Sequence, residues 1–174
     1  MSTIKLINES SVIQNVDAIV NAANRSLFNG SGVCGAIFTK AGWKELSDAC
    51  SKYKTPLNDG EVAITDSFNI KSCKKIIHAV GPDFNRRDAN LDDLFKAYYN
   101  SLKCLMDNGL HSISFPLISS GIFGGTLKDP VRVSTRKCID AYNKFIKDFP
   151  DYDVDVLLCA YGKDEYIEAL NEIE

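Results

Sequence analysis

Apolar residues recur along the chain in two alternating patterns. Short apolar runs, typical of buried strands, occupy residues 4–7, 18–21, 62–64, 75–80, 113–118 and 154–159. Segments with helical character separate them, at residues 33–51, 91–107, 129–147 and 164–173. Strands that alternate with helices predict an α/β fold with a largely parallel or mixed central sheet.

Glycine and proline mark the ends and breaks of the predicted helices. The clearest apolar helix face is formed by Leu91, Leu94, Phe95, Tyr98, Leu102 and Leu105. Gly109 follows that helix in the position typical of a helix C-terminus. Asp129-Pro130 predicts the start of the next helix, because proline is tolerated at the first helical position. Gly42 indicates a break inside the first helix. Its candidate inward residues are Ala36, Ile37, Ala41 and Leu46.

Two strand-to-helix connections are rich in glycine and small residues. The first reads Ala-Ala-Asn over residues 22–24, then Asn-Gly-Ser-Gly-Val-Cys-Gly-Ala over residues 29–36. The second reads Ser-Ser-Gly-Ile-Phe-Gly-Gly over residues 119–125. Such loops can present bare backbone N–H groups to an anion at the carboxyl ends of strands, where α/β sheets bind ligands. One loop could be glycine-rich for steric reasons alone. Two together predict a ligand with two phosphates.

Length and composition limit the classes of function. A chain of 174 residues fits one domain, spanning residues 1–174. The net charge of −3 and the pI of about 5.4 argue against binding to nucleic acid or an anionic membrane through the overall charge of the protein. The basic residues at 71, 74, 75, 86 and 87 are more typical of a solvated face. No apolar run reaches transmembrane length and no signal-peptide pattern is present, so we expect a cytoplasmic protein. We also expect a monomer.

The cysteines and histidines predict no metal site. Six cysteines are widely spaced without a C-x-x-C pair, and only His78 and His111 could join them. We expect reduced, mostly buried thiols, a structural His78 and an exposed His111. Cys34 lies in a glycine loop at a helix N-terminus, a location that favours a thiolate nucleophile. No histidine partner for it is identifiable, and a packing cysteine is the commoner case.

Four motifs together resemble the macrodomain family. They are Asn-Ala-Ala-Asn at 21–24, Gly-Ser-Gly-Val-Cys-Gly-Ala at 30–36, Ile-His-Ala-Val-Gly-Pro at 77–82 and Ser-Ser-Gly-Ile-Phe-Gly at 119–124. The resemblance covers nearly the whole chain. It implies a three-layer α/β/α sandwich with a six-stranded mixed, largely parallel sheet that binds ADP-ribose. Many members remove ADP-ribose from proteins or nucleic acids or deacetylate O-acetyl-ADP-ribose, whereas others only bind.

From this resemblance we expect a mono-ADP-ribosyl hydrolase that acts on ADP-ribosylated proteins without a cofactor or metal. O-acetyl-ADP-ribose deacetylation is a further activity that the resemblance allows. The alternative is a non-catalytic reader of ADP-ribose or its polymer. RNA binding is disfavoured by the acidic pI.

The resemblance also implies roles for individual residues. Asn24 would contact the distal ribose, and it forms the expected catalytic set with Gly32 and Cys34. The expected ligand contacts are Ser10, Ser11, Ala22, Ala23, Gly30, Val33, Gly35, Ser119, Ser120, Gly121, Ile122, Phe123 and Tyr161. Asn21 is expected to bond loop backbone. A water held between the loops, the ligand's phosphate and the distal ribose would attack the anomeric carbon, with that phosphate as base.

Three positions depart from common family patterns. Ser10 stands where many members have an Asp that accepts the adenine amino group, with Glu9 adjacent as the alternative reader. Cys34 stands where hydrolases of the MacroD type have an Asp, although alphavirus macrodomains, which include active hydrolases, have Cys there. Gly162 stands where several relatives have an Asp.

Overall fold

The computed structural model describes all residues, Met1–Glu174, and contains one six-stranded sheet. The strands are β1 (Thr3–Ile7), β2 (Ala18–Ala23), β3 (Val62–Asp66), β4 (Lys75–Val80), β5 (Ser112–Pro116) and β6 (Asp155–Cys159). The helices are α1 (Gly32–Ala41), α2 (Trp43–Cys50), α3 (Leu91–Asp107), α4 (Pro130–Asp148) and α5 (Lys163–Ile173). Two short 3-10 turns, η1 (Ser11–Ile13) and η2 (Ile122–Gly124), complete the chain.

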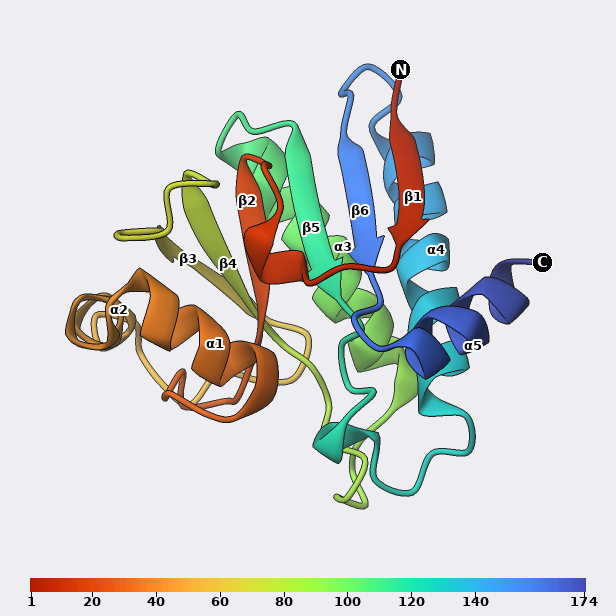
Figure 1. The fold of residues 1–174 in the computed structure, drawn as a ribbon, viewed down its shortest axis with the longest axis horizontal. Helices are drawn as coiled ribbons and strands as arrows, with labels where there is room; N and C mark the ends of the chain where they lie inside the picture. Colours follow the sequence, from red (N-terminus) through yellow and green to blue (C-terminus); the bar gives the residue numbers. More distant parts are fainter.

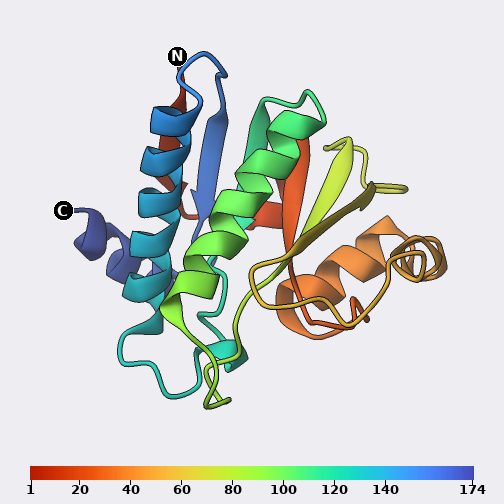
Figure 2. The same ribbon diagram turned by 180° about the vertical axis from the view of Figure 1, so that it is seen from behind.

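The sheet is mixed and largely parallel, and helices cover both faces. Its order is β1-β6-β5-β2-β4-β3, and only the β3–β4 pair is antiparallel. Helices α1 and α2 lie over one face, and α3 and α4 lie over the other, with α5 beside α4 near the β1 edge (Figures 1 and 2). The expected three-layer α/β/α sandwich is confirmed.

Each helical layer encloses its own core. A cluster of 22 buried residues fills the space between the sheet and α3 and α4. A second cluster, of 15 residues, lies between the sheet and α1 and α2. Strands buried on both faces explain why most of the predicted strands are continuous apolar runs rather than alternating ones.

Most predicted element boundaries agree with the structure to within a residue or two. The helix expected at 91–107 is α3, and Gly42, with φ 112°, breaks the first helical segment into α1 and α2. One inward assignment was wrong, and one residue of a predicted apolar face is exposed. Ala36 is exposed because α1 turns Cys34, Ile37, Phe38 and Ala41 toward the core, and Ala36 lies off that face. Leu91 is 40% exposed because it is the first residue of α3.

The neighbouring strands β2 and β5 separate toward their carboxyl ends. They share only two residue pairs, Ala18 with Ile113 and Ile19 with Ser114, whereas β2 pairs with β4 along its whole length. From β2 the chain continues to β3 and β4 on one side, and from β5 to β6 on the other. This split is therefore the topological switch point of the sheet, where ligands of open α/β sheets bind.

Candidate functional site

The first glycine-rich loop begins at Asn24, directly after β2, and is anchored by its second residue. Arg25 donates two hydrogen bonds to Asp59, from Nε to Oδ1 (2.8 Å) and from Nη2 to Oδ2 (3.0 Å). The Arg25 carbonyl accepts from the N–H of Leu57 (2.8 Å). A bidentate pair of this kind fixes geometry as well as charge. It holds the start of the loop, and with it Asn24, in one position.

The Asn24 side chain is oriented by the backbone of Phe28. Its Nδ2 donates to the Phe28 carbonyl (2.9 Å), and its Oδ1 accepts from the Phe28 N–H (2.9 Å). A carboxamide has two N–H groups and two lone pairs. Asn24 therefore keeps one donor and one acceptor for the hydroxyls of a sugar.

Backbone N–H groups accumulate where this loop enters α1. The N–H groups of residues 30–34 donate to no acceptor in the protein, and the Ser31 side chain does not cap the helix. Gly32 has φ 60°, which turns the chain into α1. A Cβ on Gly35 would lie 2.5 Å from the Gly30 carbonyl oxygen, so only glycine allows the loop to pack this closely on the helix. Free N–H groups at a helix N-terminus favour an anion.

The second loop follows β5 and presents a similar array. Ser119 donates its hydroxyl to the Pro82 carbonyl (2.7 Å), and Ser120 donates to the Leu117 carbonyl (2.7 Å). Both side chains are thereby used within the protein. The N–H groups of residues 119–123 donate to no acceptor in the protein. These residues, including Gly121, thus offer a ligand their backbone.

The segment between β4 and α3 holds the second loop in place. Phe84 donates its N–H to the Phe123 carbonyl (2.8 Å), and Asn85 donates Nδ2 to the Ile122 carbonyl (2.8 Å). Gly125 has φ 48°, and a Cβ there would overlap the backbone of Phe84. The loop therefore rests on the 84–85 backbone, and its free N–H groups are fixed before any ligand arrives.

Three large apolar side chains are exposed on loops at this edge of the sheet. Phe28 is 69% exposed, Ile122 is 78% exposed, and Tyr161, just after β6, is 74% exposed. Asn8 holds the Tyr161 segment by donating Nδ2 to the Ala160 carbonyl (2.9 Å) and the Tyr161 carbonyl (3.1 Å). Exposed apolar side chains around free N–H groups suit a ligand with both apolar rings and phosphates.

Ser10 and Ser11 lie in the turn after β1. Ser10 caps η1, its hydroxyl oxygen accepting from the Val12 N–H (3.2 Å), and Ser11 is buried. Glu9 is exposed, and one of its carboxylate oxygens accepts from Gln14 Nε2 (2.9 Å). Ser10 keeps one lone pair and Glu9 keeps one free carboxylate oxygen. Either residue can therefore accept a hydrogen bond from the adenine amino group.

Cys34 is a buried thiol in the first turn of α1. It is 6% exposed, and its Sγ lies 3.5 Å from the Phe28 carbonyl oxygen. Burial raises the pKa of the Cys34 thiol above its ordinary value. The neutral thiol is a poor nucleophile, because thiolate is the reactive form.

Beneath Cys34 lies a buried polar chain that crosses three strands. Asn21 Nδ2 donates to His78 Nδ1 (3.0 Å), and His78 Nε2 lies 2.9 Å from Thr65 Oγ1. Burial lowers the pKa of His78 to about 4. The expectation that Asn21 bonds loop backbone was wrong, because its amide is directed at the histidine and its Oδ1 has no partner. His78 has the structural role expected of it.

Comparison with known proteins shows the family to which this chain belongs. The family model described as "Macro domain" matches residues 20–134. The chain belongs to the macrodomain family. The matched residues run from β2 into α4 and include both glycine-rich loops.

Relatives of this macrodomain include proteins named as enzymes. It is 39% identical over 166 residues to an uncharacterized protein of Fusobacterium nucleatum, a match that covers 94% of this chain and 90% of that protein. It is 45% identical over 113 residues to the O-acetyl-ADP-ribose deacetylase of Escherichia fergusonii, a match that covers 63% of each.

Solved macrodomain structures have the same fold. An Oceanobacillus iheyensis macrodomain with ADP superposes with a TM-score of 0.86 at 31% identity, covering 99% of this chain and 90% of that one. A Trypanosoma brucei macrodomain in complex with ADP-ribose gives a TM-score of 0.84 at 30% identity, covering 98% and 69%. None of the helices of this macrodomain has the length and apolar character needed to span a membrane.

The structure brings the two expected loops to the two sides of the β2–β5 split. Ala22 and Ala23 end β2, and Val33 lies in the first turn of α1. The residues that anchor the loops were not predicted from the sequence: Arg25, Asp59, Asn85 and Asn8. Among these residues only Arg25 could have been noticed in the sequence, because it is next to Asn24.

Proposed function

We propose that residues 1–174 act as one macrodomain that binds ADP-ribose at the β2–β5 split and hydrolyses mono-ADP-ribose from modified proteins. The observation that carries this proposal is the pair of free N–H arrays, at residues 30–34 and 119–123, which follow the neighbouring strands β2 and β5. Each array suits one phosphate of a pyrophosphate. The complexes of related macrodomains with ADP and ADP-ribose support the same ligand.

The pyrophosphate would be held by backbone dipoles rather than by charged side chains. Arg25 is the only charged residue in the loops at 24–35 and 119–125, and Asp59 already engages it. The distal ribose would lie against Asn24, with Phe123 beside it. Adenosine would lie toward Ser10, Ser11 and Tyr161.

Hydrolysis at this site would depend on positioning. Neither loop contains Asp or Glu, so the protein offers no carboxylate base from them. A water between the loop backbone and the ligand would attack the anomeric carbon and transfer a proton to the ligand's phosphate. The bond from that carbon to the acceptor's ester oxygen would break, and the side-chain carboxylate would leave. Asn24 would fix the ribose for that attack, and orientation of this kind can supply several kcal/mol of the barrier. The buried Cys34 thiol contributes shape and its N–H.

Two other activities at the same site have specific support. The lack of a loop carboxylate favours a reader that binds ADP-ribose without cleaving it. The similarity to the Escherichia fergusonii deacetylase favours removal of acetyl from O-acetyl-ADP-ribose. All three activities require the two N–H arrays.

Two measurements separate these activities. Calorimetry with free ADP-ribose tests binding, and release of ADP-ribose from a peptide mono-ADP-ribosylated on glutamate tests hydrolysis. The proposal expects both to be positive. Binding without release would move the assignment to a reader, or to a deacetylase if O-acetyl-ADP-ribose is turned over. Absence of binding would refute all three.

A further inference from the structure

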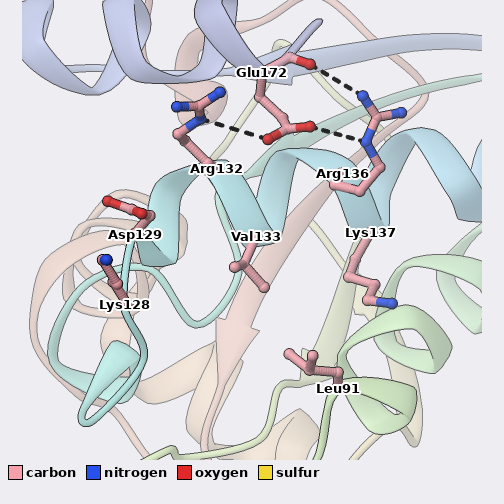
Figure 3. A pocket seen from close by; sticks show the side chains of 8 residues that line it. All are labelled: Leu91, Lys128, Asp129, Arg132, Val133, Arg136, Lys137 and Glu172. Atoms are coloured by element: carbon pink, nitrogen blue, oxygen red, sulfur yellow. Dashed lines mark hydrogen bonds and ion pairs between the residues drawn. The ribbon is translucent and has the colours of Figure 1, made fainter.

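A charged hollow of about 370 Å³ lies at the start of α4, outside the β2–β5 split. Four cationic side chains line it, namely Lys128, Arg132, Arg136 and Lys137. Figure 3 shows Arg132 and Arg136 on either side of Glu172 of α5, with Lys128 and Lys137 at opposite ends of the hollow. We call this hollow the α4 groove.

The α4 groove has an excess of positive charge. Its acidic residues are Asp129 and Glu172, so the lining carries four cations and two anions in a chain of net charge −3. Lys128 and Lys137 have no acidic partner within 4.0 Å. This local charge is opposite to that of the molecule as a whole, and it favours an anionic ligand.

The two arginines are held in place before any ligand binds. Arg136 donates Nε to Glu172 Oε2 (3.1 Å) and Nη2 to the Glu172 carbonyl (3.0 Å). Arg132 Nε lies 3.5 Å from Glu172 Oε1. Guanidinium N–H groups outnumber these contacts, so donors remain for a carboxylate.

The apolar residues of the α4 groove indicate which anion fits. The half-buried Val133 lies between Lys128 and Lys137, and Leu91 of α3, 40% exposed, lies on the side of the hollow away from the arginines (Figure 3). The lining contains no aromatic residue, so the groove lacks the stacking platform on which single-stranded nucleic acids bind. An aliphatic patch among cations suits a peptide that carries both carboxylates and a branched apolar side chain.

The α4 groove lies close in sequence to the second glycine-rich loop, because Lys128 follows Gly125 by three residues. Lys128 follows Phe123 by five residues, which span at most roughly 18 Å when fully extended. An extended peptide of about six residues could cover the same distance. A segment in the groove could therefore belong to the protein whose modified side chain lies at the split.

We propose that the α4 groove docks an acidic segment of the ADP-ribosylated protein and so selects substrates with acidic, aliphatic-containing flanks. This proposal rests on the proposed function for its biological meaning, but the docking step can be measured without catalysis. Lysine and arginine would pair with the carboxylates, and Leu91 and Val133 would contact the apolar side chain.

The first test measures docking alone. The probe is a fluorescein-labelled ten-residue peptide, unmodified, that contains four aspartates, one leucine and neutral residues. We expect fluorescence anisotropy at low salt to show binding that Lys128→Glu with Lys137→Glu weakens about tenfold, the scale for two or three exposed ion pairs. The matched control is Lys44→Glu with Lys52→Glu on and after α2, which makes the same change in net charge. Neither control lysine lies in the groove or has an acidic partner.

The second test measures selection of substrate. Two peptides mono-ADP-ribosylated on glutamate are compared, one with aspartates about six residues away and one with asparagines there. The wild type should show a lower KM for the acidic peptide at equal kcat, and the groove variant should lose that difference. Affinity for free ADP-ribose should be the same in all variants.

The outcomes distinguish the two proposals. Equal peptide binding by the wild type, the groove variant and the control would overturn the docking proposal whatever the catalytic result. Tighter binding of a single-stranded RNA than of the acidic peptide would overturn it too. Peptide binding that depends on the groove, together with no ADP-ribose release, would support docking and reject only the hydrolase.

Discussion

Replacing Gly121 by valine tests whether the second glycine-rich loop binds a phosphate. A Cβ added at Gly121 meets no heavy atom within 4 Å, so the change places its methyl groups in open space. The N–H groups of residues 119–123 remain, but the valine side chain stands where a phosphate oxygen would approach them.

The magnitude follows from the contacts that are blocked. A hydrogen bond to a charged group contributes about 1.5–3 kcal/mol, so losing two of them costs roughly 3–6 kcal/mol of binding. This corresponds to at least a hundredfold weaker ADP-ribose affinity. Gly121→Ala, with one methyl group, should cause a smaller loss, and the two variants should form a graded series.

Calorimetry with ADP-ribose measures the affinity, and thermal unfolding checks that each variant is folded. Gly121 has φ −92° and ψ −122°, outside the α and β regions, so we expect each substitution to lower the melting temperature somewhat while the protein stays folded. The affinity should fall from glycine to alanine to valine. Wild-type affinity in a folded Gly121→Val variant would refute the assignment of this loop to the pyrophosphate.

Three further changes test other parts of the site. Ser10→Asp should tighten ADP-ribose binding by roughly 1 kcal/mol in calorimetry, because a carboxylate accepts a stronger hydrogen bond from the adenine amino group. Asp can still cap η1 as Ser10 does. Weaker binding, together with a large loss of affinity for Glu9→Ala, would assign adenine to Glu9. Cys34→Ser should keep most of the single-turnover rate of ADP-ribose release, and complete inactivation with unchanged binding would identify a thiol nucleophile. The His78 pKa of about 4 lies below its usual value of 6.5. The contribution of neutral His78 to the free energy of unfolding is therefore fully present above pH 6.5, and about 3 kcal/mol of it is lost as the pH drops toward 4. Urea unfolding at pH 7 and pH 5 should show a smaller loss of stability for His78→Gln than for the wild type, and equal losses would contradict a buried neutral histidine.

Local patterns in the sequence predicted most of the fold. The α3 helix was placed at its observed bounds because its apolar face, its amphipathic length and Gly109 agree. The two 3-10 turns were not predicted, because three residues are too few to show a period. Leu91 was placed on the apolar face of its helix from spacing, yet it is 40% exposed, because periodicity gives the face of a helix but not where its first turn meets solvent.

The candidate site was predictable only in part, for a physical reason. Glycines mark loops that expose backbone, and such loops are visible in the sequence. The side chains that fix those loops act over long separations: Arg25 and Asp59 are 34 residues apart, and Asn85 and Ile122 are 37 residues apart. No local pattern connects such partners. The α4 groove likewise joins residues from three helices.

The most direct test of the proposed hydrolase is single-turnover release of ADP-ribose from a glutamate-linked peptide by the wild type and Asn24→Ala. Asn29→Ala is the matched control, because Asn29 is an exposed asparagine of the same loop without a side-chain hydrogen bond. We predict release by the wild type and a normal rate for Asn29→Ala. Release by Asn24→Ala should be about a hundredfold slower, because a misoriented ribose loses that order of rate. No release by a wild type that binds ADP-ribose, or equal rates for all three proteins, would contradict this prediction.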